Sequence, residues 1–255
     1  MKAVFLKDLS NYYKSSTVYI LSAILLLLTG VMFFAKVFYY SQNCLKFASM
    51  PSEYSNTYNF GSLVLSGLPS FVAFLLLFII PFLTMRLFSE EKKLGTLELL
   101  FTYPITEFGL IFGKYLSCFL AIIPSILISA MLPLTLFKLI PNMEWGYIIS
   151  GYIGVILFCL AAIAIGMWAS SMTDNQLIAG IITVVSLILF WIIGFPGDIL
   201  QGGWKDFFSA VSFANNLEDF MKGSVNLQNI VYFICISAFF IYLTYYNLSA
   251  RKWRS

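Results

Sequence analysis

Six long stretches without a charged residue constrain this chain more than any other feature of its sequence. Each is at least 21 residues long, and every charged residue lies outside them. A helix needs about 20 apolar residues to cross a hydrocarbon core roughly 30 Å thick. The sequence therefore predicts an all-α polytopic membrane protein, one domain over residues 1–255, with these spans: 15–35, 54–85, 115–137, 145–173, 175–197 and 223–250.

The composition excludes a water-soluble domain and several classes of chemistry. Charged residues are 11% of the chain, whereas soluble proteins have about 25%. The chain has no histidine, so it lacks the commonest general base and metal ligand. Its four cysteines are scattered singly, which favours packing roles over a zinc site. No polybasic stripe indicates a nucleic-acid partner.

The distribution of basic residues predicts the orientation. Ten of the 15 Lys and Arg lie in the two termini and in the segment 86–114. By the positive-inside rule, both termini and this segment are cytoplasmic. No cleavage site follows the first span, which we interpret as an uncleaved anchor.

The predicted spans hold no central charge that would indicate an ion-coupled transporter. Three lysines lie at span ends, where we expect them to snorkel toward the interface: Lys36, Lys114 and Lys138. Four prolines within spans two and three predict local kinks: Pro69, Pro81, Pro124 and Pro133.

The cytoplasmic segment 86–114 predicts a short amphipathic helix that lies parallel to the membrane. Charges at residues 90–93 precede a leucine-rich run over 94–101, and Pro104 ends any helix. Such a helix could simply rest on lipid. A carboxylate at Glu98 among leucines favours a protein partner instead, because an anionic leaflet does not attract it.

Two further amphipathic stretches flank the spans. Apolar residues at helical spacing near the start predict an interfacial helix entering span one, in which a partner contact and a pure membrane contact are both possible: Phe5, Leu6, Leu9, Tyr12 and Tyr13. The outer loop 198–222 predicts one or two short interfacial helices and a possible outer interface at Trp204, Phe207 and Phe208.

Several motifs resemble those of a known family. Residues 88–100 (FSEEKKLGTLELL), followed by Pro104 and Gly113-Lys114, resemble the E-E-x-x-x-G-T-x-E-L-L-x-x-x-P…G-K segment of ABC-2-type transporter permeases. More narrowly, the chain resembles the gliding-motility-associated ABC transporter permease through GYIG (151–154), AIG (164–166), ASSMTDNQ (169–176) and RKW (251–253). The similarity covers essentially the whole chain and is weakest in the outer loop.

The resemblance implies a six-helix permease of the bacterial inner membrane. It implies as partners a second copy of the chain, two separate ABC ATPase subunits, an auxiliary protein with an extracytoplasmic domain, and membrane lipids. The partner ATPase would bind ATP and Mg, so this chain would be non-catalytic and hold no cofactor. The family's ATPase-coupling interface corresponds here to Glu90, Glu91, Gly95, Thr96, Leu97, Glu98, Leu99 and Leu100, with Phe5, Leu9 and Tyr12 of the N-terminal helix.

Three functions remain open from the sequence. The first is a permease that couples ATP hydrolysis by a separate ATPase to export of a substrate. The second is a mechanotransmission subunit that drives an extracytoplasmic partner without cargo crossing the membrane. The third, an ATP-independent secondary transporter or scaffold, is disfavoured because the spans offer no ion site.

Overall fold

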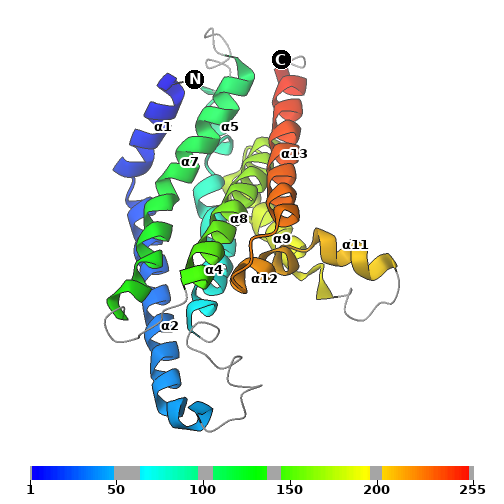
Figure 1. Ribbon diagram of the computed structural model, residues 1–255. Helices are drawn as coiled ribbons and strands as arrows, with labels where there is room; N and C mark the ends of the chain where they lie inside the picture. Colours follow the sequence, from blue (N-terminus) through cyan, green and yellow to red (C-terminus); the bar gives the residue numbers. More distant parts are fainter. Residues whose placement is uncertain (1, 49–63, 97–105, 137–144, 196–202, 253–255) are drawn as a thin grey trace.

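The computed structural model describes residues 2–48, 64–96, 106–136, 145–195 and 203–252, and within these ranges all regular secondary structure is helical (Figure 1). This confirms the predicted all-α class. The elements are α1 Lys2–Lys14, α2 Ser16–Ala48, α4 Gly67–Thr84, α5 Ser89–Lys93, α7 Glu107–Ala130, the 3-10 helix η2 Leu132–Leu136, α8 Trp145–Met172, α9 Gln176–Ile192, α11 Gly203–Val211, α12 Phe213–Met221 and α13 Leu227–Lys252.

Five of the helices in these ranges are long and apolar enough to cross a membrane: α2, α4, α7, α8 and α13. The predicted fifth span corresponds to α9, which is equally apolar but has 17 residues. A helix of that length spans roughly 25 Å. The count of six spans therefore stays a prediction, whereas the several apolar helices agree with a multi-pass membrane protein.

The bounds predicted for the first three spans differ from those of the helices. The first span was expected over 15–35, but α2 continues through Lys36 to Ala48. The third span was expected over 115–137, but α7 begins at Glu107, where the Thr106 hydroxyl accepts a hydrogen bond from Gly109 N–H, and ends at Ala130. The expected start was wrong because Lys114 lies inside the helix. The second span was expected from residue 54; α4 begins at Gly67, and residues 54–63 lie outside the described ranges.

Prolines do not interrupt the two helices that contain them. The helix α4 continues through Pro81, and α7 continues through Pro124. Pro133 lies in η2, beyond the end of α7. A proline inside a helix has no N–H for the carbonyl four residues earlier, so Pro124 leaves the Leu120 carbonyl without its helical donor.

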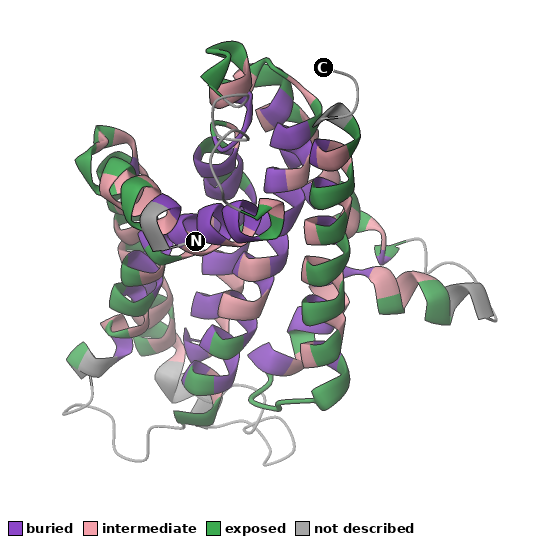
Figure 2. Cartoon of the chain, turned by 90° about the horizontal axis from the view of Figure 1, so that it is seen from above, coloured by how far each residue is buried: buried purple, intermediate pink, exposed green. Residues whose placement is uncertain are grey.

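The helix α8 forms the centre of the molecule and contacts α4, α7, α9, α12 and α13. In its most apolar window 72% of residues are buried, against 22% in α2 and 28% in α13. Figure 2 shows the buried residues concentrated on the inner helices and the exposed ones on the outer surfaces. The apolar outer faces of α2 and α13 suit contact with lipid.

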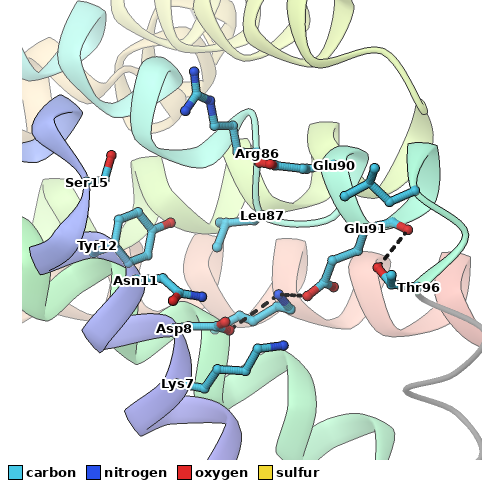
Figure 3. A pocket seen from close by; sticks show the side chains of 12 residues that line it. Lys7, Asp8, Asn11, Tyr12, Ser15, Arg86, Leu87, Glu90, Glu91 and Thr96 are labelled. Atoms are coloured by element: carbon cyan, nitrogen blue, oxygen red, sulfur yellow. Dashed lines mark hydrogen bonds and ion pairs between the residues drawn. The ribbon is translucent and has the colours of Figure 1, made fainter.

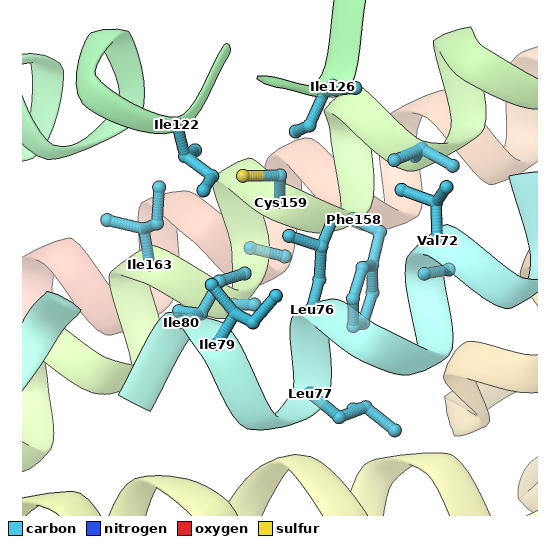
Figure 4. Packing of buried hydrophobic residues seen from close by; sticks show 14 of the residues in the cluster. Val72, Leu76, Leu77, Ile79, Ile80, Ile122, Ile126, Phe158, Cys159 and Ile163 are labelled. Atoms are coloured by element: carbon cyan, nitrogen blue, oxygen red, sulfur yellow. The ribbon is translucent and has the colours of Figure 1, made fainter. Parts of the chain in front are cut away.

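Buried aliphatic side chains from three helices fill the space beside α8 (Figure 4). Leu76 and Ile80 of α4 and Ile122 of α7 are completely buried, as are Phe158 and Ile163 of α8. Lipid tails are as apolar as these side chains, so close van der Waals packing holds the helices together more than transfer from water does.

Two short helices, α11 and α12, follow α9 as the outer-loop prediction expected, but they differ in environment. In α12, Phe213 and Phe220 are buried and the helix packs against α8, so it belongs to the core. In Figure 1, α11 extends away from the other helices. Its Phe207 is exposed and packs edge-to-face on Phe208, with ring centroids 5.8 Å apart, whereas the Trp204 side chain lies outside the described part. Their position at a membrane interface stays a prediction.

Candidate functional site

Several elements meet at the end of the bundle where α1 begins and α13 ends (Figure 1). They are α1, the segment 85–96 that follows α4, the first turns of α7, and the link between α8 and α9. Hydrogen bonds and ion pairs among side chains from these elements form a buried polar network. This network is the candidate site.

Three charged residues, which we call the charge cluster, lie at its centre: Asp8 of α1, Glu91 of α5 and Lys114 of α7. The Lys114 Nζ lies 2.8 Å from Glu91 Oε1 and 3.3 Å from Asp8 Oδ2 (Figure 3). The three side chains are only 4%, 18% and 12% exposed for Lys114, Glu91 and Asp8 respectively. The same ammonium lies 5.4 Å from the centroid of the Phe88 ring, within the range of a cation–π contact.

The charge cluster has more acceptors than its cation can satisfy. Two carboxylates and one ammonium give it a formal charge of −1. Among the described residues, the buried Glu91 Oε2 has no hydrogen-bond partner, and the buried Asp8 Oδ2 has none beyond its 3.3 Å ion pair with Lys114 Nζ. Lys114 is in ion-pair range of both carboxylates and compensates their charge, since an uncompensated charge in the interior is strongly disfavoured.

The structure corrects the expectation that Lys114 snorkels to the membrane interface. The side chain is buried between α1 and α5 and its ammonium is used in two ion pairs. Lys36 is half-buried and its side chain lies close to Gly67, at the start of α4. Lys138 lies outside the described residues.

On its other side, the segment 85–96 is fastened to α8 and the α8–α9 link. The Ser170 hydroxyl accepts hydrogen bonds from the N–H groups of Phe88 and Ser89, at 3.0 and 3.1 Å, and donates to the Met85 carbonyl at 3.2 Å. Lys92 donates to the Ser171 carbonyl, and its Nζ lies 4.0 Å from Asp174. The segment is thus held on both sides.

The last helix joins the same network through two side chains. Asn247 of α13 donates its amide N–H groups to the carbonyl and hydroxyl of Ser171, both at 3.1 Å. Ser249 donates to Glu107 at the start of α7, at 2.6 Å. Motion of the segment 85–96 would therefore reach α8 and α13 as well as α1 and α7.

Two adjacent tyrosines of α1 satisfy backbone carbonyls that their own helices leave free. As α4 ends, the Leu87 N–H donates to the Thr84 carbonyl instead of the Leu83 carbonyl four residues earlier. The Tyr12 hydroxyl donates to this free Leu83 carbonyl at 3.2 Å. Tyr13 donates to the Leu120 carbonyl, also at 3.2 Å, which Pro124 deprives of its helical donor. Burial raises the pKa of Tyr12 well above its ordinary value, so its hydroxyl remains a donor near neutral pH.

Replacing Tyr12 with Phe should lower the free energy of unfolding by about 1 kcal/mol, because the Leu83 carbonyl loses this donor. Thermal unfolding of the detergent-solubilised chain measures the effect. The matched control is Tyr19→Phe in α2, where the residue is 58% exposed. Equal melting temperatures for the two variants would show that the Tyr12 hydrogen bond adds no stability.

A cavity of about 590 Å³ opens beside the charge cluster, between α1 and the segment 85–96 (Figure 3). Four of the predicted interface residues line it: Tyr12, Glu90, Glu91 and Thr96. The remaining residues of its lining are Lys7, Asp8, Asn11, Ser15, Arg86, Leu87, Leu94 and Lys114. The predicted Phe5 and Leu9 are half-buried elsewhere on α1. The predicted interface residues thus come together only in part.

The predicted amphipathic helix of this segment is described only at its start. The helix α5 has five residues and ends at Lys93, and Gly95, two residues later, has a φ of +69°. The Thr96 hydroxyl donates to the Glu91 carbonyl at 3.3 Å. The predicted Leu97, Glu98, Leu99 and Leu100 lie outside the described residues, so their role stays a prediction.

Sequence reasoning missed Asp8, Lys92, Ser170 and Asn247 and misjudged Lys114. Two patterns could have identified the charge cluster. Asp8 is the only acidic residue between residues 1 and 52, and Lys114 is the only basic residue between 94 and 137. Among the described residues, no group of three His, Cys, Asp or Glu side chains could hold a metal ion.

The family described as ABC-2 family transporter protein matches residues 40–246 of the chain. The matched range covers every helix from α4 to α12, with the end of α2 and most of α13. No curated protein matches the chain. The match supports a multi-pass membrane protein of this kind, whereas the narrower resemblance to gliding-motility permeases stays a prediction.

Proposed function

Because the chain belongs to the ABC-2 family of transporter proteins, we propose that it is a permease subunit that a separate ATPase drives through the segment 85–96. Members of this family are the membrane components of ABC transporters, so membership implies an ATPase partner. The chain itself would be non-catalytic. ATP and Mg would bind to the partner.

One observation carries this proposal: buried polar contacts fasten the segment after α4 to α1, α7 and α8. Glu91 joins it to α1 and α7 through Lys114, and Ser170 joins it to α8. A displacement imposed at this end would therefore be passed to the spans rather than absorbed by a loose loop. Such fixation suits a segment that receives force from a partner.

The wider assembly follows the resemblance of the sequence. We propose that two copies of the chain bind two ATPase subunits and move a substrate outward across a bacterial inner membrane. An auxiliary protein with an extracytoplasmic domain would contact the outer helices near Phe207. Mechanical output without cargo is the alternative; ATP-dependent cargo movement in vesicles that contain only the permease and the ATPase would exclude it.

Replacing Gly95 with Ala should weaken binding of the ATPase about tenfold, because a left-handed conformation costs a residue with a side chain roughly 1–2 kcal/mol. An Ala at this position would leave the left-handed conformation in the free permease, and binding would have to restore it. The measurement is the dissociation constant of the purified permease for its ATPase. Gly95→Asn should bind more tightly than Gly95→Ala, because Asn tolerates this conformation better.

The matched control for Gly95→Ala is Gly30→Ala in α2. A side chain added at Gly30 would meet no other atom within 4 Å, and the helix favours Ala there. We expect Gly30→Ala to bind the ATPase as the unmodified chain does. Equal binding by the two Ala variants would contradict a coupling role for this turn. Absence of ATPase binding by the unmodified chain would contradict the proposed function itself.

The proposed orientation places both termini in the cytoplasm. A green fluorescent protein fused after residue 255 should therefore be fluorescent, since this reporter does not fold when exported unfolded to the periplasm. Alkaline phosphatase, which is active only outside the cytoplasm, should be active when fused at residue 224, between α12 and α13. The reverse pattern would contradict the orientation and place the segment 85–96 out of reach of an ATPase.

A further inference from the structure

Lys114 is where three separate parts of the chain are held together. Its ammonium contacts Glu91 of α5 at 2.8 Å and Asp8 of α1 at 3.3 Å, and the lysine itself belongs to α7. It lies seven residues into α7, roughly 10 Å along the helix from Glu107. The contacts thus connect the segment 85–96 to α1 and α7 at a point inside the bundle and not at its outer end.

The charge cluster is a contact of the segment in which both partners are charged and mostly buried. Opposite charges attract far more strongly in a buried site than in water, and the Lys114 side chain is 4% exposed. On the other side of the segment, the Ser170 contacts are neutral hydrogen bonds. The Lys92 ion pair there is 4.0 Å long, and Asp174 is 58% exposed, so solvent screens it.

We propose that Lys114 is a positioning residue of the coupling route: it makes α1, α5 and the first turns of α7 move as one body when the ATPase displaces the segment 85–96. The proposal rests on the function proposed above. Separating any one of the three elements would leave a buried carboxylate without its cation. The tyrosine contacts of α1 with Leu83 and Leu120 then extend the motion to α4 and to the middle of α7.

The first test uses a neutral variant of the charge cluster, Asp8→Asn with Glu91→Gln and Lys114→Met, beside the conservative variant Lys114→Arg. The neutral variant keeps the shapes of the side chains and leaves no buried charge uncompensated. The readout is the change in ATP turnover that the permease causes in the assembled complex, measured in lipid nanodiscs. We expect the neutral variant to reduce this change about tenfold and Lys114→Arg to preserve most of it.

The outcomes separate the inference from the function on which it rests. An unmodified permease that fails to bind an ATPase would contradict the proposed function. An unmodified permease that binds, beside a neutral variant that retains full control of turnover, would overturn the role of Lys114 alone. A stable neutral variant that no longer binds the ATPase would also overturn it, because the cluster would then be part of the docking surface.

A second test needs no substitution and stands even where the variants fold poorly. Hydrogen–deuterium exchange of the unmodified complex is compared with and without a non-hydrolysable ATP analogue. We expect residues 2–14, 85–96 and 107–114 to change their exchange rates together. A change over 85–96 without a change over 2–14 would show that α1 is not coupled to the segment and would overturn the inference.

Discussion

Replacing Lys114 with Met should lower the free energy of unfolding by about 3–5 kcal/mol, the cost typical of breaking a buried charge cluster by removing one partner. Methionine has a similar length and no charge, so the loss reflects Asp8 and Glu91, which would remain buried without a cation. The measurement is the urea or thermal unfolding of the solubilised chain, followed by circular dichroism.

Two variants serve as controls for this effect. Lys222→Met removes a lysine from an exposed pair with Glu218, 2.6 Å apart and more than half exposed on both sides, so its effect should be below about 1 kcal/mol. Converting Asp8 to Asn and Glu91 to Gln in the Lys114→Met background should recover most of the stability. A stable Lys114→Met single variant would contradict the buried cluster.

Replacing Gly166 with Ala should destabilise the protein by about 1–3 kcal/mol, because α4 and α8 approach too closely there for a methyl group. A Cβ at Gly166 would overlap Thr84 Oγ1 and lie 2.7 Å from Thr84 Cβ. Thr84 is completely buried and its hydroxyl already donates to the Ile80 carbonyl at 3.0 Å, so the side chain has little room to move. The measurement is again the unfolding midpoint.

The control for Gly166→Ala is Gly180→Ala in α9. An added Cβ at Gly180 would lie 3.6 Å from the Met85 sulfur, an ordinary van der Waals contact. Gly180→Ala should therefore be neutral or slightly stabilising, since Ala favours a helix more than Gly does. Adding Thr84→Gly to Gly166→Ala should restore part of the packing. Equal stability of Gly166→Ala and Gly180→Ala would contradict the close approach of α4 and α8.

Much of the fold could be predicted from the absence of charge alone. The helices α8 and α13 begin and end within a few residues of the predicted spans, because a bilayer imposes a minimum apolar length that composition reveals directly. The same rule misplaced α7, since a buried lysine looks in sequence like a lysine at a membrane interface. Only its partners distinguish the two, and Asp8 is 106 residues away in sequence.

The sequence predicted some of the residues that line the cavity, but not the contacts that hold them there. The charges at residues 90–93 and the resemblance located the segment after α4, and Glu91 and Tyr12 do lie at one cavity. The partner of Tyr12 is a backbone carbonyl at the end of α4. Almost every residue has the same backbone N–H and C=O groups. No residue pattern could therefore reveal this contact, or the hydrogen bonds that Ser170 accepts from two N–H groups.

The most direct test of the coupling account is site-specific photo-crosslinking in the complete chain. A photoreactive amino acid is placed at the exposed Thr96, beside the charge cluster, and separately at the exposed Phe207 in α11. The account predicts that position 96 crosslinks to an ABC ATPase in membranes and that position 207 does not. An ATPase crosslink from position 207, or an assembled complex without any crosslink from position 96, would contradict it.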